Sequence, residues 1–278
     1  MKARPLIPFL VESGLCADRK QAEAWLMAGK VLVNDQPARA GSLVKSADAV
    51  RLKEAPFPYA SRGGLKLSGA LYALGLNPQG LVCLDAGAST GGFTDCLLQQ
   101  GASLVYAVDV GFGQLTGSLR QDARVVNLER TNLADPSLKA LNPRPAFATC
   151  DLSYLSLRDA VPLYQQILDG QGTLVALVKP LFEVADPQAR RSGRIPDGAY
   201  QPMLKELCDH LNAQPGTAVM GICPSPVTGS AGTIEFFLHI RFCGGAAQDL
   251  RQAIADSVAA ALETQSPRKA GNNSLGPA

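Results

Sequence analysis

The sequence Asp85-Ala-Gly-Ala-Ser-Thr-Gly-Gly-Phe93 lies between an apolar run at residues 81–84 and a helix-like run at residues 93–100. This order is typical of a strand, a glycine-rich turn and the start of a helix. Glycines in such a turn let the backbone approach a ligand closely, and the N–H groups at a helix start favour a carboxylate or a phosphate. The stretch therefore predicts a ligand-binding turn, with an ordinary tight turn of an α/β domain as the alternative.

The spacing of these glycines narrows the choice of ligand. It matches neither G-x-G-x-x-G nor G-x-x-x-x-G-K-[ST], which weakens the dinucleotide and P-loop interpretations. S-adenosylmethionine, with its small carboxylate head, fits better. The next apolar run, residues 104–108, ends in Asp109, where an acidic side chain can hydrogen-bond ribose hydroxyls. We therefore expect the cofactor S-adenosylmethionine to contact Asp85, Gly87, Ser89, Thr90, Gly91, Gly92, Phe93 and Asp109.

From residue 61 onward, predicted strands alternate with predicted helices, which indicates a parallel sheet with helices on both faces. The strands are expected at residues 81–85, 104–109, 124–127, 146–150, 172–178, 217–222 and 234–241. The helices are expected to begin near residues 62, 92, 114, 135, 156 and 199. No long amphipathic segment separates the last two strands, so we expect an antiparallel hairpin at one end of the sheet. A final helix is expected at residues 246–263.

A smaller part of the chain precedes this pattern. Two short helices are expected at residues 6–12 and 18–28, the second with Asp18 as its N-cap and Gly29 as its C-cap. A strand at residues 31–34, a turn at 34–37 and a strand at 49–52 follow as a small sheet. Prolines within residues 54–59 favour a semi-rigid linker. The sequence therefore predicts domains at residues 1–58 and 59–264, and a disordered tail at 265–278.

Composition and residue spacing argue against a disulfide-bonded, a metal-binding and a membrane-spanning protein. The net charge is +2, and the first 60 residues carry nine basic and six acidic side chains, which permits nucleic-acid binding without requiring it. The seven cysteines never form C-x-x-C, and most lie in apolar runs, as in the reduced core of a cytoplasmic protein. Neither histidine has a partner at metal-ligand spacing, so no metal is expected. No signal pattern is present, and no apolar run approaches the roughly 18–20 residues of a membrane helix.

Four ionisable residues lie where strands or helices begin or end. Asp151 and Lys179 each follow an apolar strand, and ligands of doubly wound sheets bind outside the carboxyl ends of the strands. Lys66 lies on the helix that begins near residue 62, and Glu235 opens the last strand. We expect Asp151 and Lys179 to face the crevice opened by the glycine turn. The alternative is an ordinary surface ion pair between them.

Motifs along most of the chain resemble the TlyA family of ribosomal RNA 2′-O-methyltransferases, also called hemolysin A. That family joins a small α+β S4-type RNA-binding domain to an FtsJ-like, Rossmann-like methyltransferase domain. The resemblance covers residues 4–262, and departs at Arg4-Pro-Leu6, Leu181 and Thr233. It rests on Gly29-Lys-Val-Leu-Val-Asn34, Ser61-Arg-Gly-Gly-Leu-Lys-Leu67, residues 85–93, Tyr106-Ala-Val-Asp-Val-Gly111, Glu129-Arg-Thr-Asn132, Cys150-Asp-Leu-Ser153 and Leu177-Val-Lys-Pro180.

The resemblance implies a catalytic tetrad of Lys66, Asp151, Lys179 and Glu235, and 2′-O-methylation of cytidine in 16S or 23S ribosomal RNA. A 2′-hydroxyl is a very weak acid, so its methylation requires a nearby base and in-line placement. A lysine acts as a base only when neutral. We assign Lys179 as the base, held by Asp151 and Glu235, and expect Lys66 to position the hydroxyl or the adjacent phosphate.

Basic residues suggest how ribosomal RNA or a ribosomal subunit would bind. One group lies in the small domain, Arg62 lies one helical turn before Lys66, and a third group lies in a glycine-containing loop beyond Lys179. The candidates are Arg19, Lys20, Lys30, Arg39, Lys45, Arg62, Arg190, Arg191 and Arg194. Tyr154, three residues past Asp151, is either a base-stacking residue or a core aromatic.

Two other classes of function are open from the sequence. The first is a non-catalytic RNA-binding or ribosome-assembly factor on a methyltransferase scaffold. It is disfavoured because every residue of the tetrad and of the glycine turn is present. The second is a membrane-active hemolysin, which would need a long apolar or strongly amphipathic segment, and the sequence contains neither.

Overall fold

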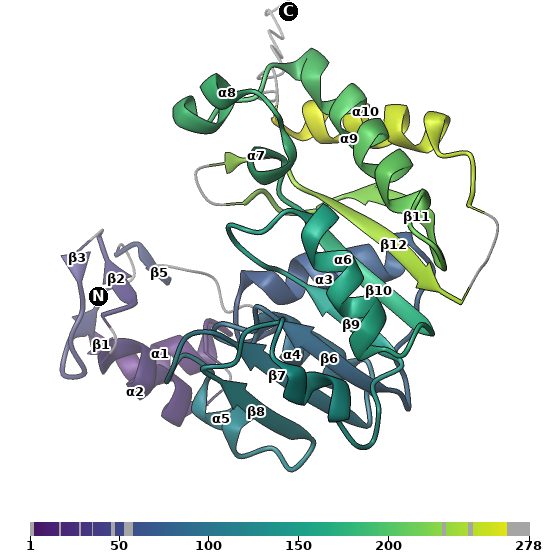
Figure 1. Cartoon of the computed structure of the whole chain (residues 1–278). Coiled ribbons are helices and arrows are strands. Elements are labelled where there is room, and N and C mark those ends of the chain that lie inside the picture. Colours follow the sequence, from purple (N-terminus) through teal and green to yellow (C-terminus); the bar gives the residue numbers. More distant parts are fainter. Residues whose placement is uncertain are drawn as a thin grey trace, which may run out of the picture. The chain divides into compact units, whose positions relative to one another are not determined.

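The computed structural model describes residues 3–16, 18–27, 29–34, 36–45, 48–52, 58–229, 232–243 and 247–265. The chain forms two compact units, residues 1–58 and 59–278 (Figure 1). Each unit has its own hydrophobic core. Residues 54–57 of the predicted linker and residues 266–278 of the predicted tail lie outside the described residues.

The first unit combines two helices with two small antiparallel sheets around one core that includes Leu6, Leu10, Val31 and Val44. The helices are α1 (Leu6–Glu12) and α2 (Arg19–Met27). One sheet pairs β1 (Arg4–Pro5) with β4 (Leu43–Val44). The other has the order β3 (Gln36–Pro37), β2 (Val31–Val33) and β5 (Val50–Leu52).

Both predicted helices of this unit are present. The Asp18 carboxylate accepts a hydrogen bond of 2.7 Å from the Gln21 N–H, as an N-cap does. Gly29 has a φ of +65°, the left-handed conformation of a C-cap glycine. The prediction missed β1, β3 and β4, because a two-residue strand is too short to show a period of two.

The second unit is built on a seven-stranded sheet, and all seven predicted strands are present. The strand order is β11-β12-β10-β9-β6-β7-β8. Only the pairs made by β12 are antiparallel, which confirms the terminal hairpin. The strands are β6 (Val82–Ala86), β7 (Leu104–Asp109), β8 (Val125–Glu129), β9 (Phe147–Cys150), β10 (Gly172–Val178), β11 (Thr217–Pro224) and β12 (Phe236–Phe242).

Helices cover both faces of this sheet (Figure 1). Successive strand residues point to opposite faces, so in β6 Cys83 packs into one core and Leu84 into the other. The first core is shared with α3 (Arg62–Ala73), α4 (Gly92–Gln99) and the short α5 (Gly117–Arg120). The second is shared with the 3₁₀ helix η1 (Pro136–Ala140), α6 (Leu157–Ile167), α9 (Asp197–Asn212) and α10 (Arg251–Gln265).

Several predicted helix positions were wrong. The helix expected near residue 114 is only the four-residue α5, and the helix expected near residue 135 is a 3₁₀ helix. The last helix begins at Arg251 rather than near residue 246. Two short helices were missed: α7 (Pro180–Glu183) and α8 (Pro187–Ser192). Each begins with a proline, which fits the first helical position although it reads as a breaker in the sequence.

The strand directions bring the predicted site residues to one edge of the sheet. Asp151 and Lys179 directly follow the carboxyl ends of parallel strands, the glycine turn continues from another, and Asp109 is the last residue of a fourth. Because β12 runs antiparallel to β10 and its Phe236 pairs with Val178, the residue before it, Glu235, starts from the same edge.

Candidate active site

The four residues of the predicted tetrad lie together as two ion pairs. Lys179 Nζ lies 2.7 Å from Asp151 Oδ1 and donates a hydrogen bond of 3.0 Å to Ser153 Oγ. Lys66 Nζ lies 2.5 Å from Glu235 Oε2. No side chain of these two pairs is more than 26% exposed, so neither is an ordinary surface pair. Glu235 therefore pairs with Lys66, and not with Lys179 as the sequence predicts.

Glu235 is the most buried member of the tetrad, with 7% of its side chain exposed. Burial raises the pKa of Glu235, while the charge of Lys66 and the hydrogen bond from it lower that pKa. A buried carboxylate is costly unless a cation is bonded to it. Lys66, which projects from α3, supplies that cation and links α3 to the start of β12.

Gly87 is the residue of the glycine turn that lies against Asp151. Its φ is +86°, in the left-handed region, and a Cβ at this position would lie 2.5 Å from the carbonyl oxygen of Asp151. A side chain would therefore both strain the backbone and displace the segment that carries Asp151. This explains why the position requires glycine.

A cavity of about 600 Å³ opens beside the glycine turn. Its lining includes Gly87, Ser89, Asp109, Asp151 and Tyr154. The Asp109 carboxylate accepts one hydrogen bond of 2.7 Å from the Ser89 N–H and another of 2.7 Å from the Gly111 N–H. These bonds fix its orientation, and each carboxylate oxygen keeps a further lone pair for a ligand.

Four polar residues that line this cavity were not among the predicted site residues: Gln114, Thr131, Asn132 and Ser153. Gln114 accepts a hydrogen bond of 3.2 Å from the Ser89 hydroxyl. Thr131 and Asn132 follow the carboxyl end of β8. Two polar residues just beyond a strand end are the sequence signal for this part of the site.

Asp85 lies beneath the turn and does not line this cavity. It is fully buried, and its carboxylate accepts hydrogen bonds of 2.7 Å from the Thr94 hydroxyl and 2.9 Å from the Thr149 hydroxyl. Thr94 lies on α4 and Thr149 on β9, so this carboxylate joins three elements. Asp85 therefore stabilises the packing of these three elements. Its direct contact with the cofactor remains a prediction.

This carboxylate should make stability depend on pH. Burial raises the pKa of Asp85 from 3.8 to about 6, although the threonine hydroxyls lower it. Between those values the folded chain holds a proton that the unfolded chain releases, so the free energy of unfolding falls as pH rises. The full shift corresponds to ~3 kcal/mol. Urea unfolding of Asp85→Asn between pH 4 and 6 should give a flatter pH dependence than the wild type, and an unchanged slope would exclude Asp85 as its source.

Four more predicted cofactor residues belong to the second half of the turn and do not line the cavity: Thr90, Gly91, Gly92 and Phe93. A Cβ on Gly91 would clash with Leu119, and Phe93 is buried against Phe237 with ring centroids 6.0 Å apart. A Cβ on Gly92 would meet Ser61 Oγ. These residues let the turn and α4 pack closely against neighbouring elements. They therefore support the cavity wall without lining the cavity.

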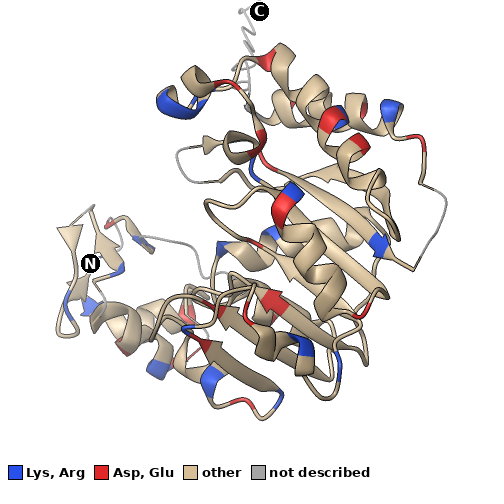
Figure 2. Cartoon of the chain, in the orientation of Figure 1, with Lys and Arg blue, Asp and Glu red and all other residues tan. Residues whose placement is uncertain are grey.

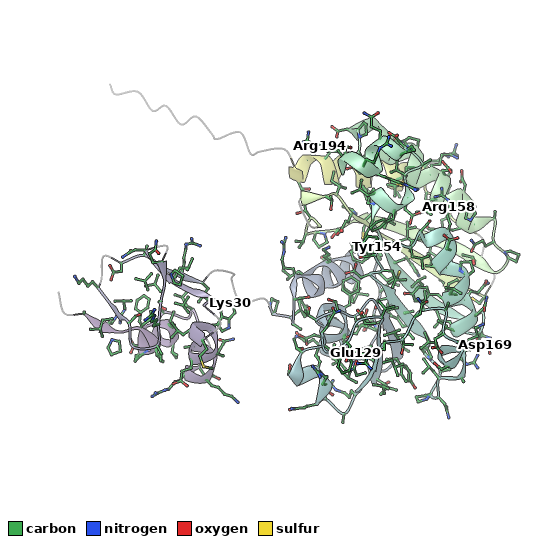
Figure 3. All side chains as sticks on the ribbon, turned by 60° about the vertical axis from the view of Figure 1, so that its left-hand side comes forward. Lys30, Glu129, Tyr154, Arg158, Asp169 and Arg194 are labelled. Carbon is green, nitrogen blue, oxygen red and sulfur yellow. The ribbon has the colours of Figure 1, made fainter. Side chains whose placement is uncertain are left out.

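A second cavity has a volume of about 530 Å³. Ser153 and Tyr154 line both cavities, and Lys179 lines the second. Tyr154 is 90% exposed, and its ring centroid lies 5.4 Å from that of Phe182 (Figure 3). The core interpretation of Tyr154 was therefore wrong, and its ring face is available for stacking. Arg194 and Glu235 also line this cavity.

The predicted RNA-contacting residues fall on both units. In the second unit, Arg62 opens α3 and is exposed, and Arg194 lines the second cavity. Arg190 and Arg191 lie in the last turn of α8, not in a loop as predicted, and appear as a blue stretch in Figure 2. Of the three arginines beyond Lys179, Arg194 is the one that lines a cavity together with Lys179 and Glu235.

The candidates of the first unit are mostly exposed at its surface. The exposed ones are Arg19, Lys20, Arg39 and Lys45. Arg19 forms an ion pair of 2.7 Å with Glu23, and Lys30 lies 5.2 Å from the centroid of the Trp25 ring. Their role in RNA binding remains a prediction.

Other features of the described residues bear on metals, membranes and cysteines. Within those residues, no three His, Cys, Asp or Glu side chains gather as metal ligands would. None of the helices there combines the length and apolar character needed to cross a bilayer. The seven cysteines, all within the described ranges, are free thiols, and six are buried, as predicted for core residues.

Comparison with known families assigns the class that this fold and site define. The model of the FtsJ-like methyltransferases matches residues 59–242, and the model of the S4 domain matches residues 4–50. The chain therefore belongs to the FtsJ-like methyltransferase family and carries an S4 domain before the methyltransferase part.

Individual relatives extend over most of the chain. The 16S/23S rRNA (cytidine-2′-O)-methyltransferase TlyA of Mycobacterium tuberculosis is 39% identical over 239 residues, which cover 84% of this chain and 87% of that protein. Hemolysin A of Brachyspira hyodysenteriae is 33% identical over 83% of this chain and 97% of its own. A solved structure from Streptococcus thermophilus, described as a hemolysin, has a TM-score of 0.70 at 35% identity and covers 95% of this chain and 97% of that one.

Proposed function

We propose that this protein transfers a methyl group from S-adenosylmethionine to a ribose 2′-hydroxyl of ribosomal RNA, with cytidine as the target nucleoside. The observation that carries the proposal is the pair of cavities that share Ser153 and Tyr154 beside the Lys179–Asp151 ion pair. A methyl donor in one cavity and a nucleotide in the other would meet at this pair. The TlyA relative, 39% identical, is named for the same reaction.

The cavity beside the glycine turn suits S-adenosylmethionine. Its volume of about 600 Å³ lies within the usual range of small-molecule sites. Gly87 permits close backbone approach, and Asp109 presents acceptors for the ribose hydroxyls of the cofactor. Bound there, the cofactor supplies an electrophilic methyl group on a sulfonium centre.

The second cavity suits a nucleotide drawn out of its helix. The exposed faces of Tyr154 and Phe182 offer stacking surfaces for a base, and Arg194 offers a cation for a phosphate. Lys179 lines this cavity, as does Glu235, the partner of Lys66. Binding in this way would place a 2′-hydroxyl near Lys179.

Lys179 would act as the general base. Its neutral amine would accept the proton of the 2′-hydroxyl while the methyl group passes from sulfur to the 2′-oxygen; the S–CH₃ bond would break as the O–CH₃ bond forms, and S-adenosylhomocysteine would leave as a neutral thioether. The ammonium formed has three N–H donors, and three acceptors surround Nζ: Asp151 Oδ1 at 2.7 Å, Ser153 Oγ at 3.0 Å and the Asp151 carbonyl at 3.5 Å. These contacts would stabilise the charge that proton transfer creates.

Recognition of the RNA would fall to the S4 domain and to arginines around the site. The exposed cations of the first unit suit phosphate contacts, which fix register and orientation but read no sequence. Arg62 lies one helical turn before Lys66 and suits a phosphate next to the target nucleotide. A ribosomal substrate would place the protein in the cytoplasm.

A methyl-transfer assay on purified ribosomal subunits tests this function. We expect the wild-type protein to move label from radioactive S-adenosylmethionine to ribosomal RNA. Stable binding to subunits without any transfer of label would instead establish a non-catalytic assembly factor. Lysis of erythrocytes without RNA labelling would favour the membrane-active class.

A further inference from the structure

Glu183 is a buried carboxylate next to the active site that the tetrad does not use. It is the last residue of α7, and α7 begins directly after Lys179. Only 2% of its side chain is exposed, and it lines neither cavity. Burying a carboxylate is costly unless it is fully hydrogen-bonded, so its partners indicate what the charge stabilises.

The partners of Glu183 all belong to the start of α6. Its Oε1 accepts a hydrogen bond of 2.7 Å from the Leu157 N–H, and its Oε2 accepts one of 2.7 Å from the Ser156 hydroxyl. Arg158 Nη1 lies 3.5 Å from the same Oε2. Ser156 is the N-cap of α6, and its own Oγ accepts from the Arg158 N–H. Glu183 thus completes the cap of α6 from a separate helix.

This cap fixes one end of residues 151–156, the segment that joins β9 to α6. One end of the segment is tied to the sheet by a hydrogen bond of 3.0 Å from the Asp151 N–H to the Ala86 carbonyl. Near the other end, Tyr154 has a φ of +68°, a left-handed conformation that is rare for an aromatic residue. Such a conformation persists only where surrounding contacts hold it.

Helix α7 supplies those contacts at two places. The Phe182 ring packs on Tyr154, and the Glu183 carboxylate binds the end of the segment at Ser156. Residues 151–156 carry one side of the central ion pair, Asp151, and α7 follows the other side, Lys179. The anchor therefore joins the two stretches of chain whose relative position sets the Lys179–Asp151 contact.

We propose that Glu183 is a positioning residue for methyl transfer, which holds residues 151–156 against α7 so that Asp151 and Ser153 stay in contact with Lys179. This role rests on the proposed function, because it concerns the same reaction. Glu183 lines neither cavity; it acts through the segment whose Ser153 and Tyr154 line both.

The variant Glu183→Gln tests the anchor with little change of volume. The amide oxygen can still accept from the Leu157 N–H, but the NH₂ group faces the Ser156 hydroxyl and the Arg158 guanidinium. The hydrogen bond that Ser156 donates is therefore lost or reversed, and the ion pair with Arg158 is lost. We expect kcat to fall roughly tenfold or more, since small misplacements of reacting groups are costly. We expect KM for RNA and for S-adenosylmethionine to stay within about twofold of the wild type. The pH dependence of kcat should shift, because the surroundings of Lys179 change.

A matched control is Glu206→Gln. Glu206 is 75% exposed and binds the other side of the Arg158 guanidinium at 3.0 Å, so this variant removes a carboxylate from the same arginine without touching residues 151–156. Its kcat and pH profile should equal those of the wild type. A second variant, Ser156→Ala, removes one hydrogen bond to Glu183 and should lower kcat less than Glu183→Gln does. In the double variant, the fold-reduction of kcat should be smaller than the product of the two single reductions.

Hydrogen exchange gives a readout that does not depend on activity. We expect amides of residues 152–157 to exchange faster in Glu183→Gln, with β6 and β10 protected as in the wild type. Wild-type kcat, pH profile and exchange in Glu183→Gln would overturn the proposal, as would a general loss of protection and of cofactor binding in both Glu183→Gln and Ser156→Ala. If the wild-type protein labels no RNA, the proposed function fails, and unchanged exchange at residues 152–157 would separately refute the anchor.

Discussion

Lys179→Ala should reduce methyl transfer to ribosomal RNA by ~10²- to 10⁴-fold, the usual effect of removing a general base. RNA binding and cofactor binding should remain close to those of the wild type, because Lys179 acts on the hydroxyl in the transition state. Asp151→Ala should behave similarly, since Asp151 lies 2.7 Å from Lys179 Nζ and orients it. Single-turnover rates at saturating RNA and cofactor measure this directly.

A second lysine–aspartate pair provides the control for charge removal. Lys205 lies 2.5 Å from Asp209 on α9, and both side chains are more than half exposed. Lys205→Ala should leave turnover unchanged, because exposed ion pairs contribute little to stability and Lys205 lines neither of the two cavities. If Lys179→Ala kept wild-type turnover, Lys179 would be a structural residue, and the role of the base would pass to Lys66.

Gly87→Ala should abolish detectable binding of S-adenosylmethionine. A Cβ there would lie 2.5 Å from the Asp151 carbonyl oxygen, so it would push residues 151–156 away and deform the cavity beside the turn. The φ of +86° adds backbone strain on the order of 1 kcal/mol. Isothermal calorimetry with the purified protein measures the loss.

Backbone strain alone can be separated from the steric clash by Gly80→Ala. Gly80 also has a positive φ, +73°, but a Cβ there would meet nothing within 4 Å. This variant should lose a little stability and keep its cofactor affinity. Equal affinity of the Gly87→Ala protein and the wild type would place the cofactor elsewhere.

The sequence was sufficient to predict the edge of the sheet where the site lies. Apolar runs of four to eight residues identify buried strands, and a glycine turn or a charged residue at the end of a run marks the carboxyl edge. Asp109, Asp151 and Lys179 were found in this way, and the structure brings Asp151 and Lys179 into contact. The hairpin was predictable because the chain between its strands is too short for a crossover helix.

Pairing within the tetrad could not be predicted from the sequence. Lys66 and Glu235 are 169 positions apart, and only the antiparallel insertion of β12 next to β10 brings them together. The burial of Asp85 could not be predicted either. Its place at the start of the glycine turn indicated a residue that contacts the ligand. Its burial against Thr94 and Thr149 depends on the packing of α4 and β9. A strand end shows where a side chain starts, but tertiary packing decides which way it points.

The sequence also failed to predict the short helices that begin with proline. Pro180 and Pro187 read as breaks, yet each occupies the first position of a helix, and α7 carries both Phe182 and Glu183. A helix of four residues shows no periodicity in a sequence. The contacts that hold Tyr154 and the start of α6 were therefore visible only in the structure.

The position of the transferred methyl group tests the central claim most directly. Alkali cleaves RNA through the free 2′-hydroxyl, so a methyl group on that oxygen protects the adjoining phosphodiester bond. Ribosomal RNA labelled by the protein from radioactive S-adenosylmethionine should therefore yield its label in alkali-resistant dinucleotides with a 5′ 2′-O-methylcytidine. Label recovered in mononucleotides would mean methylation of a base, and would contradict a site built to activate a ribose hydroxyl.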